Sequence, residues 1–484
     1  MTDLKSLQHL GAFCYPTYLL SYNSNLQSKH GCNCVKRLSV ILLILLLITP
    51  FALLWLAGIS PFAVRDALGV GTGLTAKLAC SGHYLSGFSD EQNRSDIASY
   101  SPAAEAVTLR HVAPDTIEAE MFGLARATAR YYPGLGCTLQ YPGMIDMSAL
   151  QVPAVQQRQE RWPQGEEIRT PDAQIQQLLQ ELLDEDAQLG LDTRALLVVR
   201  GGEIVAESYK NGVAADTPLL GWSMAKSITA IILGRMEALG LANVDDTSLF
   251  AAWSGDPRRE ISLQNLLQMS SGLEFDEPYE PGSDSTRMLF MEPSAAAVAL
   301  ASPLGHAPGS RFYYSSGTSN LLARFAWEKL GGDTQAFLDF FATELAAPLG
   351  LGHTYLELDA SGVFVGSSYV YAPARDWARL GLLLLNDGEA AGRRLLPPGW
   401  VARASAPNSS DNDPRYGYQL WLNAGSDQLR WPDLDVRAYA MMGNRGQVVM
   451  MLPQLDALVV RLGWSAVDYP ANERLARIQG LLAQ

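Results

Sequence analysis

An apolar helix in the middle of the chain has to be buried, and this limits how the other segments can fold around it. The run from Ile228 to Gly240 holds few charges, so we expect a helix covered on most sides that ends at Gly240. The stretch Trp222-Ser223-Met224-Ala225-Lys226-Ser227 opens this run. The spacing places Ser223 at the helix N-terminus and Lys226 one turn later on the same face.

This pair of residues has the chemistry of a nucleophile and its base. A helix N-terminus offers unpaired N–H groups that can stabilise an oxyanion. Apolar surroundings lower the pKa of a lysine toward a form that accepts a proton. The alternative is a chance Ser-x-x-Lys match on a solvated helix face. Lysine is scarce in this chain and Lys226 lies in an apolar run, which favours the functional interpretation because an unpaired buried charge is costly.

Composition excludes several classes of function. The 484 residues carry a net charge of −14, which argues against nucleic acid as a partner. The sequence has no Cys-x-x-Cys and no His-Glu-x-x-His, so a zinc site has no support from motifs. We therefore expect no metal and no cofactor.

A second apolar segment, Leu38–Gly58, contains no charged residue. At about 1.5 Å per residue it spans roughly 31 Å, the thickness of a bilayer core. A cleaved signal peptide has a shorter apolar core of about 7–15 residues, so an uncleaved transmembrane helix is favoured over cleavage. Basic residues such as Lys36 and Arg37 precede it. This predicts a single-pass inner-membrane protein with a cytoplasmic N-terminus and a periplasmic catalytic domain.

These features predict four regions. They are a cytoplasmic tail (1–37), a transmembrane anchor (38–58), an exported extension with a linker (59–169) and a domain that contains the Ser223 helix (170–484). Within the extension we expect a polar loop at Ser89–Pro102, a helix at Asp115–Tyr132 and a linker at Val152–Thr170. The role of the extension stays open.

The last region has predicted strands near both of its ends and predicted helices between them. A helix start at Thr170-Pro171-Asp172 precedes a hairpin around Gly201-Gly202. Predicted helices fill the middle, and strands and a last helix close the chain. Strands at both ends around a helical middle predict one sheet built from both termini of the domain. The predicted strands are 195–199, 203–209, 436–441, 447–451 and 458–462, and the helices include 263–269, 320–330, 334–345, 374–385 and 471–482.

Two further motifs follow the first. The segment from Pro308 to Gly317 contains Tyr314, which could act as a proton shuttle, although a tyrosine at such a place can equally be a core aromatic. The segment Met442-Gly443-Asn444-Arg445-Gly446-Gln447 enters a strand. Glycines there let the backbone approach a ligand closely, although an ordinary turn would look the same.

Taken together and in this order, the motifs resemble the serine β-lactamase and penicillin-binding-protein superfamily. The likeness is to class C-related serine hydrolases, close to the esterase and 6-aminohexanoate-dimer hydrolase branch. Ser223-Met224-Ala225-Lys226 matches Ser-x-x-Lys, Tyr314-Ser315-Ser316 matches the tyrosine element, and Asn444-Arg445-Gly446 lies where members carry Lys-Thr-Gly or His-Gly-Gly. A stretch ending in Ser270-Ser271-Gly272-Leu273 also fits, with Met269 in place of the family's histidine.

The resemblance implies an α/β (α+β) fold, an antiparallel sheet flanked by helices with a helical subdomain. It implies a serine hydrolase that cleaves a small-molecule ester or amide through an acyl-enzyme on Ser223, and the predicted segment Leu38–Gly58 would anchor this hydrolase in the membrane. Lys226 and Tyr314 would share the proton transfers, and which is the principal base stays open. The backbone N–H groups of Ser223 and Gln447 would form the oxyanion hole. The residues implied for substrate binding are Asn444, Arg445, Gly446 and Ser316.

One departure from the pattern bears on the substrate. The last lysine in the chain is Lys329, so the third motif lacks the lysine that helps hold the substrate carboxylate in β-lactamases. This puts β-lactam hydrolysis and D-Ala-D-Ala peptidase activity in doubt and favours small amides or esters. Arg445 could replace the missing charge.

Two other functions fit the sequence less well. A non-catalytic β-lactamase-fold protein with a binding or cell-wall-associated role would keep the fold without the reaction, but all three reactive side chains are present. A Ser-His-Asp hydrolase lacks its Gly-x-Ser-x-Gly motif, and His306 and His353 fall in segments better explained as connections. The oligomeric state cannot be inferred from the sequence.

The cysteines give a test of the topology. Cys80 and Cys137 are the two cysteines that follow the predicted anchor, on the side that would face an oxidising compartment. We expect them to form a disulfide if they lie near each other, whereas two unrelated buried thiols are the alternative.

Overall fold

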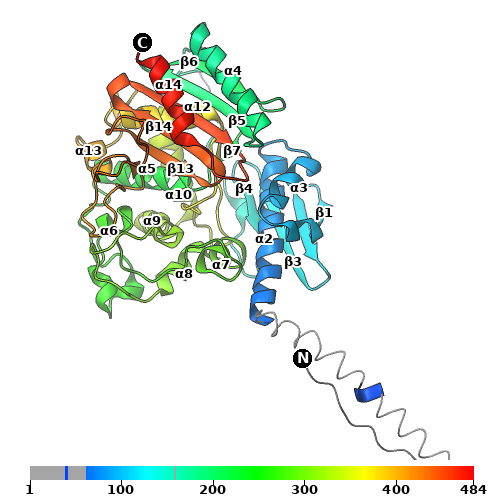
Figure 1. Cartoon of the computed structure of the whole chain (residues 1–484). Helices are drawn as coiled ribbons and strands as arrows, with labels where there is room; N and C mark the ends of the chain where they lie inside the picture. Colours follow the sequence, from blue (N-terminus) through cyan, green and yellow to red (C-terminus); the bar gives the residue numbers. More distant parts are fainter. Residues whose placement is uncertain (1–38, 42–60, 157–159) are drawn as a thin grey trace, which may run out of the picture. The chain divides into compact units, whose positions relative to one another are not determined.

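The structure is a computed structural model that describes residues 39–41, 61–156 and 160–484 (Figure 1). The chain divides into two units, 1–64 and 65–484. In the first unit, residues 39–41 are helical and helix α2 (Pro61–Tyr84) begins. Within the described ranges, no helix is both long and apolar enough to cross a membrane. The predicted anchor at Leu38–Gly58 lies outside these ranges apart from positions 39–41, so it stays a prediction.

A six-stranded antiparallel sheet lies at the centre of the second unit (Figure 1). Its order is β12-β13-β14-β15-β5-β6, so β15, near the C-terminus, pairs with β5, which follows the extension. One sheet built from both ends of the domain was predicted, and the mixed α/β fold with an antiparallel sheet and flanking helices is confirmed. The strands are β5 (Thr193–Arg200), β6 (Glu203–Tyr209), β12 (Trp421–Leu422), β13 (Tyr439–Gly443), β14 (Gln447–Leu452) and β15 (Ala457–Gly463).

Both faces of this sheet are buried, which explains the largely apolar character of its central strands. Successive side chains of a strand point to opposite faces. On β5, Leu196 and Val198 pack in a cluster with residues of α4 (Ala173–Gln188) and α14 (Ala471–Leu482). Leu197 and Val199 face the main core instead, which includes α5 (Met224–Ala238) and α12 (Ala374–Leu385). The helix that opens at Ser223 is thus covered by the sheet.

The middle of the chain supplies the helical subdomain. The helices predicted at 374–385 and 471–482 have those bounds in the structure, and the others overlap the predicted ranges. A π-helical turn (Ala342–Ala346) continues helix α10 (Thr334–Phe341). A small sheet, β7 (Leu219–Leu220), β9 (Val370–Ala372) and β8 (Tyr355–Leu356), lies beside α5. The helices of the subdomain are α6 (Leu263–Leu267), α7 (Asp284–Phe290), α8 (Ala295–Ala301), α9 (Ser316–Lys329), α10 (Thr334–Phe341), α11 (Ala347–Leu349) and α13 (Trp400–Ala404).

The helix predicted at Asp115–Tyr132 is wrong. This segment forms a hairpin of β2 (Thr116–Met121) and β3 (Ala125–Tyr132), within a four-stranded antiparallel sheet completed by β1 (Thr108–Ala113) and β4 (Gly136–Leu139). In β2 every second residue is buried, including Ile117 and Ala119. That period of two is the strand signal, and the alanines and glutamates of the segment hid it because they favour helices.

The polar loop predicted at Ser89–Pro102 is also wrong, because most of it is helix α3 (Asp90–Ala98). Ser89 caps the helix by accepting a hydrogen bond from the N–H of Gln92 at 3.1 Å. Asp96 on this helix accepts from Arg194 of β5 at 2.6 Å. A capped start and a buried ion pair hold a helix whose sequence has almost no apolar face.

The extension is bound to the rest of the unit by a disulfide and a buried ion pair. Cys80 of α2 and Cys137 of β4 are joined by a disulfide bond. Glu357 accepts hydrogen bonds from Ser81 and from the backbone N–H of Cys137, both at 2.7 Å, and forms an ion pair with Lys77. Burial lowers the pKa of Lys77 and the charge of Glu357 opposes this. Because a broken buried pair costs about 3–5 kcal/mol, these contacts fix the extension firmly.

Candidate active site

A strained turn presents Ser223 at the start of α5. The turn follows β7, and Trp222 has a φ of +48°, which is uncommon for a residue with a side chain. The Trp222 ring is buried against the rings of Tyr100, Tyr369 and Trp464. This packing holds the turn. Ser223 occupies the N-cap position, yet its side chain makes no capping hydrogen bond, which leaves its hydroxyl available to other partners.

Lys226 lies one turn into α5 and is 1% exposed. Its Nζ is 3.1 Å from Ser223 Oγ, 3.1 Å from Ser316 Oγ and 3.0 Å from the carbonyl oxygen of Ser367. Burial lowers the pKa of Lys226 to about 8, and the charge of Glu277 acts in the opposite direction. A substantial fraction of neutral amine is thus present near pH 8, one hydrogen bond away from the Ser223 hydroxyl.

Tyr314 completes the cluster from the segment before α9. Its ring lies 4.9 Å from Lys226 Nζ, measured to the ring centroid. It stacks on Trp421 at a centroid distance of 5.0 Å and meets Tyr416 edge-on at 6.0 Å. Burial is the main cause that raises the pKa of Tyr314 well above its usual value, and a hydrogen bond with Ser223 opposes the rise. The structure therefore brings the three predicted catalytic residues together.

The structure adds Glu277, which sequence reasoning missed. Its carboxylate accepts hydrogen bonds from the N–H and the hydroxyl of Ser316, both at 2.6 Å. Burial raises the pKa of Glu277 and the charge of Lys226 lowers it. Ser316 thus bridges Glu277 and Lys226. Glu277 lies in an irregular segment between Phe275 and α7, and no spacing in that segment signals a site.

Gly443 of the third motif packs against the turn that precedes Ser223. A Cβ on Gly443 would lie 2.1 Å from the carbonyl oxygen of Gly221, so only glycine lets β13 approach the turn before Ser223 so closely. Gln447, which pairs with Gly443 in the β13–β14 register, begins β14. Its side chain binds the backbone of Gly463 through both amide atoms. Asn444 uses its side-chain oxygen to accept from the N–H of Arg445 at 2.8 Å.

The guanidinium of Arg445 packs against two aromatic rings. Its guanidinium carbon lies 3.7 Å from the centroid of Tyr100 and 5.9 Å from that of Trp464. Its Nη1 donates to the carbonyl oxygen of Ser465 at 3.3 Å, and the residue is 8% exposed. These contacts give Arg445 a packing role against the extension. The substrate-binding roles predicted for Asn444, Arg445 and Gly446 stay predictions.

Met269, which replaces the family's histidine, supports the tyrosine segment. It has a φ of +57°, and its sulfur accepts from the N–H of Ser315 at 3.4 Å. Its carbonyl oxygen accepts from the N–H of Tyr313 at 2.8 Å. Met269 thereby fixes the backbone on both sides of Tyr314.

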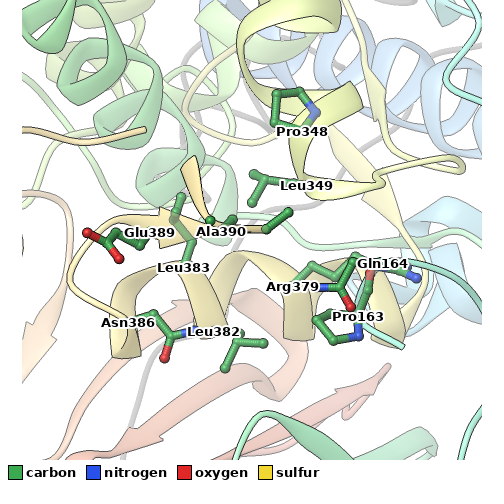
Figure 2. Close-up of a pocket in the computed structure, with 12 residues that line it drawn as sticks. Pro163, Gln164, Pro348, Leu349, Arg379, Leu382, Leu383, Asn386, Glu389 and Ala390 are labelled. Carbon is green, nitrogen blue, oxygen red and sulfur yellow. Dashed lines mark hydrogen bonds between the residues drawn. The ribbon is translucent and has the colours of Figure 1, made fainter. Parts of the chain in front are cut away.

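A separate cavity lies on another part of the surface (Figure 2). It is lined by residues of α12, among them Arg379 and Leu382, and by Pro163 and Gln164 of the segment predicted as a linker. Arg379 donates to the carbonyl oxygens of Pro163 at 3.0 Å and Gly165 at 2.7 Å, so this segment packs against α12. None of the predicted site residues lines this cavity.

Comparisons with known proteins find relatives in sequence and in fold. A 6-aminohexanoate-dimer hydrolase from Paenarthrobacter ureafaciens is 26% identical over 293 residues, which cover 57% of this chain and 74% of the relative. A family VIII carboxylesterase structure has a TM-score of 0.51 at 14% identity and covers 65% of this chain and 100% of that one. A hydrolase with promiscuous acyltransferase activity gives a TM-score of 0.52 at 17% identity, with 64% and 98% covered.

These two structures show that the fold is shared. The family is assigned from the sequence. The Beta-lactamase family model matches residues 175–482, which include Ser223, Lys226, Tyr314 and the third motif. Because this match covers more than half of the chain, the protein belongs to the Beta-lactamase family.

Proposed function

We propose that this protein is a serine hydrolase that cleaves a small ester or amide through an acyl-enzyme on Ser223. The observation that supports the proposal most is the contact of 3.1 Å between Lys226 Nζ and Ser223 Oγ, together with the lowered pKa of that lysine. A buried amine that can lose its proton beside a serine hydroxyl is the requirement for nucleophilic catalysis.

The reaction follows from the arrangement. Ser223 Oγ attacks the substrate carbonyl carbon while its proton passes to Lys226. The carbonyl oxygen becomes an oxyanion, which the backbone N–H groups of Ser223 and Gln447 stabilise. Collapse of this intermediate breaks the ester or amide bond, and the proton is delivered to the departing alcohol or amine. Water then attacks the carbonyl carbon of the acyl-enzyme while Lys226 accepts a proton from the water. The bond to Ser223 Oγ breaks and Ser223 regains a proton, which releases the acid and restores the serine.

We assign the base role to Lys226 and a proton-donor role to Tyr314. The pKa of Lys226 is about 8, so its neutral form is accessible at mildly alkaline pH. The pKa of Tyr314 is raised well above its usual value, so its phenolate is scarce. A neutral tyrosine can still donate its proton toward a leaving group, with Lys226 beside its ring.

The substrate class we propose is a small ester or short amide without a carboxylate next to the scissile bond. No lysine follows Lys329 in the sequence, and Arg445 is held against Tyr100. The relatives that support this class are the 6-aminohexanoate-dimer hydrolase and the carboxylesterase.

The test is hydrolysis of p-nitrophenyl butyrate and a short linear amide by wild type, Ser223→Ala and Lys226→Arg. Ser223→Ala should abolish turnover. Lys226→Arg keeps the charge but cannot supply a neutral base, so its rate should fall by roughly 100-fold or more. Ser227→Ala, which alters the next hydroxyl on α5, is the matched control and should retain the rate. Full activity of Ser223→Ala would refute the proposal.

We further propose that Leu38–Gly58 anchors the protein in the inner membrane and that the remainder is exported. The charge-free sequence and the basic residues before it support this, as does the disulfide between Cys80 and Cys137. Alkaline phosphatase fused after Gln484 should be active in cells, and the fusion should stay with membranes after carbonate extraction. An inactive fusion would refute export, and release by carbonate would refute the anchor.

A further inference from the structure

Three potential metal ligands meet on the extension, away from the residues of the candidate active site. His83 lies in the last turn of α2, Asp90 is the first residue of α3, and His111 belongs to β1, three elements that lie together in Figure 1. His111 Nε2 is 3.1 Å and 3.2 Å from the two carboxylate oxygens of Asp90. His83 Nδ1 is 4.0 Å from Asp90 Oδ1. The three ligand atoms all lie within 4.8 Å of one another.

The nitrogen of His83 that faces this cluster lacks a hydrogen-bond partner. His83 Nδ1 is buried, and no described residue forms a hydrogen bond with it. An unsatisfied buried polar atom lowers the stability of a protein by about 1–3 kcal/mol. The Asp90 carboxylate is 4.0 Å from His83 Nδ1, which is too far for a hydrogen bond that would satisfy this atom. The histidine side chains are each 39% exposed and Asp90 is 50% exposed, so an ion can enter from solvent.

We propose that His83, Asp90 and His111 bind a divalent transition-metal ion of the Zn²⁺ type. Two imidazole nitrogens and one carboxylate suit Zn²⁺, Ni²⁺ or Cu²⁺, whereas Ca²⁺ and Mg²⁺ prefer oxygen ligands. Bond lengths of about 2.0–2.2 Å place tetrahedral ligands roughly 3.3 Å apart. The present separations reach that spacing after small rotations of partly exposed side chains. A water molecule would complete the coordination.

The surrounding structure fixes the backbone of all three ligands. The disulfide at Cys80 holds α2 one turn before His83, and Ser89 caps α3 immediately before Asp90. Metal binding would cross-link α2, α3 and β1 and so stabilise the extension. His83 and Asp90 are 7 positions apart in the sequence, and Asp90 and His111 are 21 positions apart. These spacings match no metal-binding motif. The proposal is independent of the hydrolase activity.

The test is Zn²⁺ titration of the full-length protein in detergent by isothermal titration calorimetry. The protein is first stripped with a chelator, and its free thiols are alkylated so that Cys14, Cys32 and Cys34 cannot hold the ion. We expect one Zn²⁺ per chain and a higher melting temperature with Zn²⁺. Mg²⁺ should have neither effect.

Variants then assign the site. His83→Ala and His111→Ala should each weaken Zn²⁺ binding at least tenfold and remove the rise in melting temperature, while circular dichroism stays that of wild type. His306→Ala removes an exposed histidine elsewhere and should bind as wild type does. The proposal is wrong if wild type binds Zn²⁺ no more tightly than the two variants, or if His306→Ala loses binding to the same degree. Asp90→Asn keeps the shape of the side chain and should also weaken binding, so unchanged affinity there would exclude the carboxylate as a ligand.

Discussion

The guanidinium of Arg445 lies 3.7 Å from the centre of the Tyr100 ring, so a residue of the N-terminal extension holds the cation of the third motif. Tyr100 also meets the ring of Trp222, the neighbour of Ser223, at a centroid distance of 6.1 Å. The extension, which lies outside the residues matched by the family, is therefore packed against two of the three motifs.

This arrangement predicts a preference for uncharged acyl groups. A charge-assisted hydrogen bond to a substrate carboxylate contributes about 1.5–3 kcal/mol, which corresponds to roughly 10- to 150-fold in rate or affinity. A carboxylate that leaves water without gaining this contact is desolvated without compensation, so kcat/KM for p-nitrophenyl hemisuccinate should be at least about tenfold below that for p-nitrophenyl butyrate, which has the same leaving group. A chromogenic cephalosporin should also be a poor substrate. Efficient penicillin hydrolysis by the wild type would contradict this prediction.

The same contact predicts an effect of Tyr100→Ala. Losing the ring removes a cation–π interaction, which is worth about 0.5–2 kcal/mol, and frees Arg445 to move. The free energy of unfolding should fall by at least this amount, and the difference between hemisuccinate and butyrate should narrow. Tyr100→Phe keeps the ring and is the matched control, so it should leave the substrate preference unchanged. Equal behaviour of the two variants would show that the ring does not restrain Arg445.

Glu277 predicts a shift in the pH profile. The reactive form of Lys226 is the neutral amine, which is populated above its pKa of about 8. The rate should therefore rise with pH and level off above about 8. The charge of Glu277 raises the pKa of Lys226, so Glu277→Gln should lower that pKa and move the midpoint of kcat/KM to lower pH. Glu274→Gln, at a nearby exposed position, should not move it. A midpoint that stays or rises in Glu277→Gln would rule out the coupling.

The disulfide predicts a measurable contribution to stability. Cys80 and Cys137 are separated by 57 residues, and closing a loop of this size stabilises a protein by roughly 4 kcal/mol in the chain-entropy model. The Cys80→Ala/Cys137→Ala double variant should lose about that much free energy of unfolding. Peptide mapping of exported protein, alkylated without reduction, should find the two residues linked. If both appear as alkylated thiols, either the pairing or the proposed topology is wrong.

The parts of the fold that the sequence revealed are those with a strong period. Helices α12 and α14 have a clear apolar face, and the hairpin around Gly201-Gly202 combines a turn signal with apolar strands, so their positions follow from local pattern. The strands β2 and β3 of the extension do not follow from local pattern, because alanine and glutamate favour a helix while the buried residues of β2 recur with a period of two. Helix α3 was missed because its cap and its ion pair with Arg194 replace an apolar face.

In the candidate site, too, some residues follow from local spacing and others do not. Ser223 and Lys226 are neighbours on one helix, so their spacing alone places them together. Glu277 is linked to them by its hydrogen bond to Ser316, which is 39 positions away in the sequence, and by its charge, which acts on Lys226. No local sequence pattern marks Glu277. The sequence also does not predict the direction of the Arg445 side chain, because this direction depends on packing against Tyr100 of a distant segment. Long-range contacts of this kind are set by tertiary packing and leave no trace in periodicity.

Ser223 is the proposed nucleophile, and covalent labelling tests this role most directly. A serine-reactive phosphonate forms a stable bond with an activated serine, so intact-mass spectrometry should show one adduct per chain, and peptide mapping should place it on Ser223. Ser223→Ala should show no adduct, while Ser227→Ala should be labelled like the wild type. An adduct on another serine, or equal labelling of Ser223→Ala, would contradict the proposed mechanism.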